Sequence, residues 1–321
     1  MLFHRGKVRF GDAHPVSKEG NRTLRIPASM YYSKLGEEKI ENGEETMNYE
    51  ILIHHHIPET RNKRIEDFQP KQCRSGFYDF EKRKANSKIL LHEIKTEVHK
   101  SFALKSAYDR DMRRSADSQM YGYESLRKES EWAFSVYFDN DIDYKYIEQI
   151  RDSLRGELRI GRSRTAQYGL IQIDLLEEAG GNSTNKNISV LEKKKEMGNI
   201  EKYVLVYADA RLIFLDKYGF PTFQPNPKDL GFENGEIDWE MSQIRTFQYA
   251  PWNFKRQARD TDRCGIEKES VFYIKQKGND NVKYTEDDLV GSYQNEGFGK
   301  MIMNPAFLAS EETVIGEYRY L

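Results

Sequence analysis

The sequence predicts an α+β protein made of antiparallel sheets and arranged as two related modules. Many of the 20 tyrosines and 17 phenylalanines fall in short apolar runs that are typical of strands. One glycine-bounded loop design occurs twice, and a segment rich in glycine, asparagine and lysine separates the two copies. We therefore expect a first module over 1–178, a linker over 179–200 and a second module over 201–321.

Bulk composition excludes several classes of protein. The 321 residues are enough for two modest cores, and 32% of them are charged. No run approaches the roughly 18 apolar residues of a membrane span, and no signal peptide is visible, which predicts a cytoplasmic protein without a membrane partner. Two cysteines, Cys73 and Cys264, exclude a disulfide framework and an all-cysteine zinc site. We predict neither a metal nor a cofactor. The net charge of −2 means that any nucleic-acid contact must come from local patches.

Four strand-like segments are predicted before the helix described below. They cover 7–11, 48–56, 95–105 and 131–138. The three histidines at 54–56 have no carboxylate or thiol nearby at ligand spacing, so a structural or solvent-facing role is favoured over a metal site. The excursion at 108–123 could form a hairpin that contacts RNA through Arg113, Arg114 and Tyr121, or a solvated connection, which is the preferred interpretation.

A helix is predicted over 141–155. Ile147, Ile150 and Leu154 recur at spacings of three and four, Asp141 or Asp143 lies where an N-cap is expected, and Gly156 lies where a helix would stop. A loop with glycine at both ends follows, and the apolar run 170–176 after it predicts a buried strand.

This first glycine-bounded loop has the composition of a site for a sugar-phosphate backbone. Its glycines permit positive φ and close approach of the backbone to a partner. Its arginines are forked cations, its hydroxyls are hydrogen-bonding groups and its tyrosine offers a stacking face. The predicted RNA-binding residues of this loop are Arg159, Gly161, Arg162, Ser163, Arg164, Thr165, Gln167, Tyr168 and Gly169.

The second loop, 291–299, repeats this design 130 positions after Gly161. In both loops an aromatic residue precedes the closing glycine, and a strand-like run follows, here 301–303. Two related modules in tandem explain the repeat economically. The corresponding predicted RNA-binding residues are Asn295, Gly297, Phe298 and Gly299.

The second module is predicted to contain strands at 203–207, 211–215 and 269–274. Segment 242–259 interleaves basic and aromatic residues, a pattern that suits stacking on unpaired bases beside neutralised phosphates. A core strand with polar edges explains it equally well. From this segment we predict RNA contacts by Trp252, Asn253, Lys255 and Arg256.

The order strand, strand, helix, glycine loop, strand is most of a ferredoxin-like βαββαβ unit without its first strand and helix. The two glycine loops, Tyr-Ala-Pro-Trp-Asn at 249–253 and Asn-Glu-Gly-Phe-Gly at 295–299 resemble the RAMP superfamily of CRISPR proteins. Within it, they are most similar to the Csx-type subunit of type III-D effector complexes. The opening Gly-Lys-Val-Arg-Phe-Gly-Asp-Ala-His-Pro at 6–15 and Ile-Pro-Ala-Ser at 26–29 resemble the same subunit.

The resemblance implies tandem ferredoxin-like (RRM-like) modules and a non-catalytic subunit that binds crRNA. Such a subunit grips the five-prime repeat handle, caps the backbone filament, and contacts the large polymerase-like subunit and the backbone RAMP subunits. The family's glycine-rich loop falls on Gly161 to Gly169 and its second loop on Asn295 to Gly299.

The chain departs from the family pattern at two places. Members normally begin with an additional strand and a glycine-rich helix start, so we expect either a separate polypeptide that completes the first module or a shortened start. The family usually places glycine where this chain has Glu269, before Ser270-Val-Phe272.

Two alternatives to handle binding stay open. One is a metal-independent RAMP endoribonuclease that processes precursor crRNA, for which His99 with Lys100 or Lys105 is the candidate general base. The other is an architectural subunit without RNA contact. The prediction is that the protein is not an enzyme.

Overall fold

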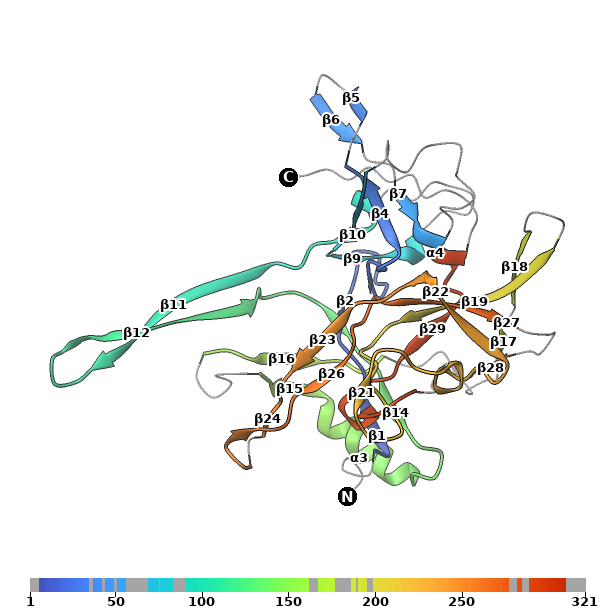
Figure 1. Cartoon of the computed structure of the whole chain (residues 1–321). Coiled ribbons are helices and arrows are strands. Elements are labelled where there is room, and N and C mark those ends of the chain that lie inside the picture. The colour runs from blue at the N-terminus through green and yellow to red at the C-terminus, as the bar shows by residue number, and fades with distance from the viewer. Residues whose placement is uncertain are drawn as a thin grey trace. The chain divides into compact units, whose positions relative to one another are not determined.

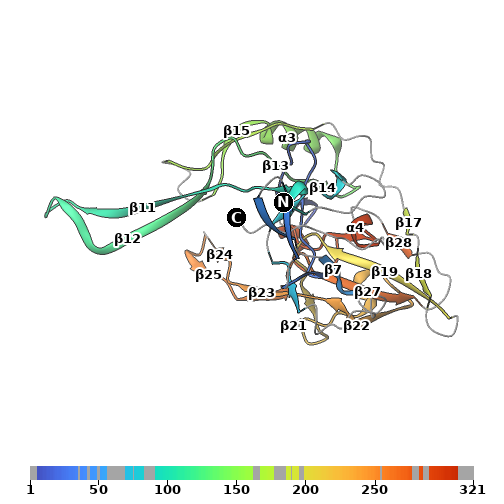
Figure 2. The ribbon, with the colours of Figure 1, turned by 90° about the horizontal axis from the view of Figure 1, so that it is seen from above.

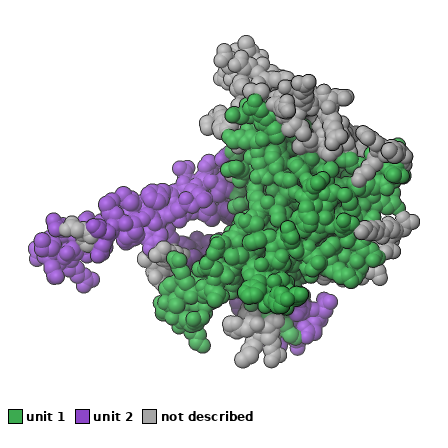
Figure 3. Space-filling model, viewed as in Figure 1, with its two compact units in different colours: residues 1–96, 133–138, 181–321 green, residues 97–132, 139–180 purple. Residues whose placement is uncertain are grey.

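The computed structural model describes residues 6–34, 37–41, 44–48, 51–55, 69–74, 76–82, 91–161, 167–176, 186–188, 190–194, 199–253, 255–276, 282–284 and 289–309. The chain divides into two compact units, coloured separately in Figure 3. Unit 1 comprises 1–96, 133–138 and 181–321, and unit 2 comprises 97–132 and 139–180.

The described residues of unit 2 form two β-hairpins and one helix. The longer hairpin is β11–β12 and the shorter is β15–β16, and both are antiparallel. The bounds are β11 (Lys100–Asp109), β12 (Arg114–Leu126), α3 (Tyr144–Leu154), β15 (Gly156–Arg159) and β16 (Leu170–Ile173).

The described residues of unit 1 hold most of the strands, two very short helices and several short 3-10 turns. In the N-terminal part and up to Phe138, the elements are β1 (Val8–Phe10), β2 (His14–Pro15), β3 (Leu24–Arg25), β4 (Met30–Ser33), β5 (Glu37–Glu41), β6 (Glu44–Asn48), β7 (Ile51–Ile53), β8 (Pro70–Gln72), β9 (Phe77–Tyr78), η2 (Phe80–Lys82), α2 (Leu91–Ile94), β10 (Lys95–Thr96) and β14 (Val136–Phe138). The remaining elements are β17 (Lys186–Ile188), β18 (Leu191–Lys194), β19 (Ile200–Ala208), β20 (Phe214–Leu215), β21 (Pro221–Thr222), η4 (Pro227–Leu230), β22 (Gly235–Gln243), β23 (Thr246–Tyr249), β24 (Trp252–Asn253), β25 (Ala258–Arg259), β26 (Arg263–Ile266), β27 (Val271–Gln276), β28 (Val282–Tyr284), η5 (Gln294–Glu296), β29 (Met301–Met303) and α4 (Ala306–Ala309). β13 (Trp132–Ala133) lies at a junction of the two units in the sequence.

Every strand pair with a register among the described residues is antiparallel, and helices are few. This confirms the predicted strand-rich α+β class. The tandem ferredoxin-like arrangement stays a prediction.

The largest sheet has five strands and organises unit 1 (Figure 1). β19 lies between β27 and β29, and β27 lies between β19 and β22. If these four strands are numbered as they occur in the chain, their order across the sheet is 4-1-3-2. β18 extends the edge that β29 occupies, because it pairs with the first half of β19 and β29 pairs with the second half.

Both faces of the two central strands are buried, which explains the continuous apolar runs at 203–207 and 271–274. Alternate residues of β19 enter different clusters: Leu205 belongs to one and Val206 to the other. Each such side chain contributes about 1.5–3 kcal/mol through burial. The sheet is therefore the middle layer of unit 1.

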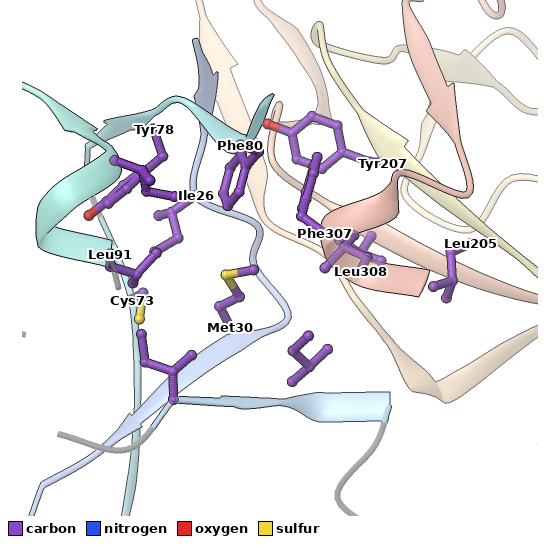
Figure 4. Close-up of a cluster of buried hydrophobic side chains, with 14 of the residues drawn as sticks. Ile26, Met30, Cys73, Tyr78, Phe80, Leu91, Leu205, Tyr207, Phe307 and Leu308 are labelled. Atoms are coloured by element: carbon purple, nitrogen blue, oxygen red, sulfur yellow. The ribbon is translucent and has the colours of Figure 1, made fainter. Parts of the chain in front are cut away.

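The N-terminal segment supplies much of one covering layer. Figure 4 shows side chains from both ends of the chain meeting in this cluster. Phe80 stacks on Phe307 of α4 with ring centroids 4.0 Å apart. The labelled members of this cluster are Ile26, Met30, Cys73, Tyr78, Phe80, Leu91, Leu205, Tyr207, Phe307 and Leu308.

Ion pairs hold β3 against the end of the central sheet. Glu269 is buried, and its carboxylate accepts from Arg25 at 2.7 Å and from Arg245. The Arg245 guanidinium also donates to the Cys73 carbonyl at 2.6 Å, and the Tyr207 hydroxyl donates to the Arg25 carbonyl at 2.9 Å. Glu269 has φ 79°, a conformation that glycine adopts without strain. Glu269 is therefore the anchor of this network.

A second buried carboxylate, Asp209, binds the same N-terminal segment. Arg22 donates to its two oxygens at 3.1 and 2.9 Å. His14 lies beside it, with Nε2 3.8 Å from Asp209 and Nδ1 2.8 Å from the Thr23 carbonyl. Burial and the positive charge of Arg22 lower the pKa of His14, which keeps the ring neutral at pH 7.

The predicted helix is confirmed and begins at its predicted cap. Asp143 accepts a hydrogen bond from the Lys145 amide at 2.9 Å, and α3 ends at Leu154, two residues before Gly156. Gly156 has φ 98° and begins β15. The strand β15 was not predicted, because Gly156–Arg159 was assigned to the loop.

Several predicted strands are shorter or broken. The strand over 131–138 is interrupted between β13 and β14, where the Gly11 amide donates to the Ser135 carbonyl at 2.8 Å. The strand over 48–56 is divided between β6 and β7, and only Phe214–Leu215 of the strand predicted at 211–215 is formed. The compact units also differ from the predicted division at residue 178, because 1–96 clusters with 181–321. The division into modules stays a prediction.

Candidate nucleic-acid interface

The first glycine-bounded loop is the loop of a β-hairpin in unit 2. Arg159 pairs with Leu170, and the Ile160 amide donates to the Gly169 carbonyl at 2.9 Å. Gly161 and Gly169 have φ 80° and 81°, so both use the conformational freedom for which glycine was expected. The predicted residues Arg162, Ser163, Arg164 and Thr165 lie outside the described residues.

The longer hairpin of unit 2 presents one face to this loop. Side chains on a strand alternate between faces, so Ala103 and Lys105 share a face with their cross-strand partners Tyr123 and Tyr121. Tyr123 is half-buried on this face, whereas the alternate positions of both strands are exposed.

The loop and the hairpin meet in a cluster of three tyrosines and one lysine: Lys105, Tyr121, Tyr123 and Tyr168. The Lys105 ammonium lies 4.8 Å from the Tyr168 ring centroid and 5.3 Å from that of Tyr123. The Tyr123 and Tyr168 rings are 5.4 Å apart, and Tyr121 meets Tyr123 edge-to-face at 5.6 Å. Lys105 also donates to the side-chain oxygen of Gln167. We call these four residues the tyrosine–lysine cluster.

This arrangement combines the two kinds of group that bind single-stranded nucleic acid. Aromatic faces stack on bases without regard to sequence, and a lysine at their side neutralises phosphate. The cation–π contacts hold the Lys105 ammonium beside the rings. The cluster can therefore accept an unpaired base together with its phosphate.

Part of this cluster was predicted from the sequence. Gln167 and Tyr168 were predicted for RNA binding, and Tyr121 was named in the 108–123 excursion. Lys105 and Tyr123 were missed as site residues. The signal that could have found them is the period-two placement of Lys105, Tyr121 and Tyr123 in two strands that pair with each other. The excursion is a hairpin, which is the first of its two interpretations.

The second glycine-bounded loop packs against the chain itself. A Cβ on Gly297 would clash with the Phe10 carbonyl oxygen, and one on Gly299 would clash with that of Val290. Phe298 is 8% exposed and packs on Phe247, so its ring has no free face for a base. Asn295 is exposed. The structure thus corrects the role predicted for Phe298: this ring is part of a core.

Gly297→Ala is expected to lower the free energy of unfolding by more than 2 kcal/mol. The substitution places a methyl group against backbone and also keeps a left-handed conformation that costs about 1–2 kcal/mol by itself. Gly20→Ala is the matched control, because Gly20 has φ 89° and open space at the Cβ position. Urea unfolding of both variants measures the difference. Equal losses would contradict a packing role for Gly297.

Trp252 and its neighbours form a short hairpin, β24–β25, in unit 1. Trp252 is 59% exposed and pairs across the hairpin with Arg259. The Asn253 amide donates to Asp260 at 3.2 Å, and the Arg256 guanidinium donates to the same carboxylate at 2.8 Å. Asn253 and Arg256, both predicted to contact RNA, therefore share the Asp260 carboxylate of the same hairpin as their hydrogen-bond acceptor. Lys255 is exposed.

His99, the candidate for the catalytic alternative, directly precedes β11 and is exposed. Its backbone carbonyl accepts a hydrogen bond from the Arg127 amide at 3.0 Å. The lysines proposed beside it interact elsewhere, Lys100 with Glu124 at 2.7 Å and Lys105 with Gln167. Whether the protein is an enzyme stays a prediction.

The histidine triplet is structural where the structure describes it. His55 is buried, and its Nε2 donates to the Leu308 carbonyl at 3.1 Å. Burial lowers the pKa of His54. His56 lies outside the described residues. Within the described part of the chain, no group of three or more histidine, cysteine, aspartate or glutamate residues is placed to hold a metal ion.

Among the described helices, none is both long enough and apolar enough to span a membrane.

Comparison with known proteins gives structural neighbours only. No family model matches the sequence, and no curated protein matches it. One similar solved structure is a cryo-EM structure of the type III-B Cmr-beta bound to cognate target RNA, with a TM-score of 0.39 and 11% identity over 83% of this chain. Another is the type III-B Cmr-beta bound to cognate target RNA and AMPPnP, with a TM-score of 0.32 and 13% identity over 78% of this chain. The present chain spans 65% and 67% of the two matched chains.

Proposed function

We propose that the protein is a non-catalytic subunit of a type III CRISPR effector complex of the III-D kind and binds the five-prime repeat handle of the guide RNA. The tyrosine–lysine cluster is the observation that carries this proposal. It unites the glycine loop, on which the resemblance to the RAMP superfamily depends, with a cation and three aromatic rings.

The sheet of unit 1 supports the finer fold assignment. The strand order 4-1-3-2, with antiparallel neighbours, is the order that a ferredoxin-like βαββαβ module requires. In place of the two helices, the described parts of the connections 209–234 and 277–300 contain the short 3-10 turns η4 and η5 and the short strands β20, β21 and β28. We propose that unit 1 contains the second RAMP module and that the first module includes α3 and the β15–β16 hairpin.

In the proposed mechanism, the glycine loop and its arginines, Arg162 and Arg164, grip handle phosphates while Tyr168 stacks on a base. The subunit caps the backbone filament and contacts the large polymerase-like subunit and the backbone RAMP subunits. We place the complex in the cytoplasm.

Purification of the tagged chain from its native host tests the function. Mass spectrometry should find other RAMP subunits, and RNA sequencing should find short RNAs that share one repeat-derived five-prime end. If RAMP subunits co-purify with this chain but the chain itself does not contact RNA, the architectural alternative is supported. Isolation of the chain alone, without RNA, contradicts the proposal, and cleavage of precursor RNA that depends on His99 supports the endoribonuclease alternative.

Arg162→Gln together with Arg164→Gln is expected to flatten the salt dependence of handle binding. Each phosphate contact on a single strand contributes about 0.7 to the slope of log affinity against log salt, so the slope should fall by about 1.4. Fluorescence anisotropy with a single-stranded handle RNA between low and moderate salt measures it. Lys228→Gln, on an exposed turn of unit 1, is the control for general charge loss. An unchanged slope in the double variant would exclude this loop from the phosphate contacts.

A further inference from the structure

His14 is a buried histidine whose hydrogen bonding fixes the position of its proton. Its side chain is 1% exposed, and Nδ1 lies 2.8 Å from the Thr23 carbonyl oxygen. A carbonyl oxygen can only accept, so Nδ1 carries the proton of the neutral ring and Nε2 presents a lone pair. Among the described residues Nε2 has no hydrogen-bond partner, and it lies 3.8 Å from an oxygen of Asp209. Two acceptors therefore face each other in a buried place.

The Asp209 carboxylate already holds a cation from the same segment as His14. Arg22 donates from one terminal nitrogen to both carboxylate oxygens, at 3.1 and 2.9 Å. Val16 forms an antiparallel bridge with Arg22, so the segment 14–25 folds back on itself. His14 and Arg22 therefore reach one carboxylate from the two arms of this segment.

The carboxylate belongs to the central sheet of unit 1. Asp209 directly follows β19, and β19 and β27 lie side by side in Figures 1 and 2. Lys268, shortly before β27, also acts on His14 and pairs with Asp12 at 3.1 Å. Within the described residues, the charged side chains that act on His14 are thus Arg22, Lys268 and Asp209.

A proton on Nε2 would give this place more positive charge than its carboxylate can neutralise. Burial and the positive charge of Arg22 lower the pKa of His14 by more than the Asp209 carboxylate raises it. The unfolded chain therefore takes up the proton more readily than the folded chain. The contribution of His14 to stability is complete above about 6.5, the pKa of a free histidine, and declines as the pH falls below that value.

Arg22, and not His14, is the group that can leave Asp209. The Arg22 side chain is 32% exposed, so its guanidinium regains water on release, whereas the His14 ring is enclosed. Protonated Nε2 becomes a donor that points at the carboxylate. A movement of about 1 Å shortens the present 3.8 Å to the length of a charge-assisted hydrogen bond.

We propose that His14 and Asp209 form a proton-operated latch for Arg22. With a neutral ring, Asp209 holds Arg22 against the central sheet. When Nε2 takes up a proton from water, His14 donates to Asp209 and Arg22 is released to solvent. The proton is lost again as the pH rises, so the change is reversible. The latch goes beyond RNA binding, because it exposes a cation on unit 1 only in acid.

Nuclear magnetic resonance of the full chain with 15N-labelled histidine tests the position of the proton. At neutral pH we expect Nδ1 of His14 to be protonated and Nε2 to be bare, and Nε2 should titrate below about 6.5. Arg22→Gln should raise the pKa of His14 and Asp209→Asn should lower it, because each removes a neighbouring charge. A neutral ring protonated at Nε2, or the same pKa in both variants, would overturn the latch.

Arginine-specific labelling with phenylglyoxal, quantified by mass spectrometry, tests the release of Arg22. The exposed Arg155 of unit 2 is the internal reference for the effect of pH on the reagent. Above the pKa of His14, the protonated fraction grows about tenfold for each unit by which the pH falls. The ratio of labelling at Arg22 to labelling at Arg155 should rise accordingly, over the range in which circular dichroism is unchanged. A ratio that is independent of pH contradicts the release.

His14→Asn removes the proton site and keeps a donor for the Thr23 carbonyl. The labelling ratio of this variant should stay at its neutral value at every pH. His99→Asn is the matched control, because His99 is an exposed histidine, and it should behave as the wild type. A pH-dependent ratio that persists without His14 would refute the assignment. If His14→Asn does not fold, the titration of His14 in Arg22→Gln decides the question alone.

Discussion

Tyr168→Ala should weaken binding of a single-stranded handle RNA by about 5- to 150-fold, because stacking of one base on an aromatic ring contributes about 1–3 kcal/mol. The loss acts through two contacts. The ring offers the stacking face, and it also holds the Lys105 ammonium, whose distance to the ring centroid is 4.8 Å. Fluorescence anisotropy at fixed salt measures the affinity.

Tyr218 is a matched control for this prediction. It is exposed, and the Lys217 ammonium lies 4.9 Å from its ring centroid, so it reproduces the tyrosine–lysine pair away from the glycine loop. Tyr218→Ala should leave RNA affinity unchanged. Lys105→Gln should lower the salt slope by about 0.7 without removing the stacking contribution. If both tyrosine variants bind RNA as the wild type does, the cluster is not the RNA site.

Glu269→Ala should lower the free energy of unfolding by about 3 kcal/mol. A buried carboxylate that neutralises two arginines is costly to remove, because the guanidinium groups lose their counter-charge. The arginines keep part of their hydration, since the Arg25 side chain is 36% exposed and that of Arg245 is 20% exposed, and this places the loss at the lower end of the usual 3–5 kcal/mol. Urea unfolding followed by circular dichroism measures the change.

Glu269→Gly separates the lost ion pair from the backbone conformation. Glycine relieves the strain of φ 79°, so this variant should be about 1 kcal/mol more stable than Glu269→Ala. Glu233→Ala removes an exposed partner of Lys228 and should cost no more than about 0.5 kcal/mol. Equal stability of the alanine and glycine variants would contradict strain at this position.

Local signals in the sequence predicted local structure well. The helix followed from Ile147, Ile150 and Leu154 with a cap at Asp143, and the apolar runs of β19 and β27 followed from their continuous hydrophobic residues. Positive φ at Gly161 and Gly169 followed from the glycine pattern of the first loop.

Long-range pairing could not be predicted in this way. Nothing in the residues around Arg25 indicates that it binds Glu269, because an ion pair carries no periodicity and the partners are 244 positions apart. The similar glycine patterns also concealed different roles. Gly161 has open space at its Cβ position, whereas Gly297 is pressed against backbone. The Phe10 carbonyl causes this difference in space at the Cβ position, and Phe10 is too distant in the sequence to be inferred from residues 291–299.

Only part of the tyrosine–lysine cluster was predicted, because the rest depends on long-range strand pairing. Tyr168 was named from the loop that contains it, but Lys105 and Tyr123 required the register of β11 against β12. A slip of one residue in that register would move both side chains to the other face. The chemistry of the cluster is therefore determined by strand pairing rather than by any one motif.

The contact between Arg25 and Glu269 also sets an order of events during synthesis. A ribosome that adds about 5–20 residues per second needs about 12–50 s to pass from one residue to the other. During that interval Ile26 and Met30, which end fully buried, have no central sheet to pack against. The nascent N-terminal segment is therefore expected to depend on holding chaperones until β27 leaves the ribosome, and slow codons before residue 271 should lower the yield of folded protein.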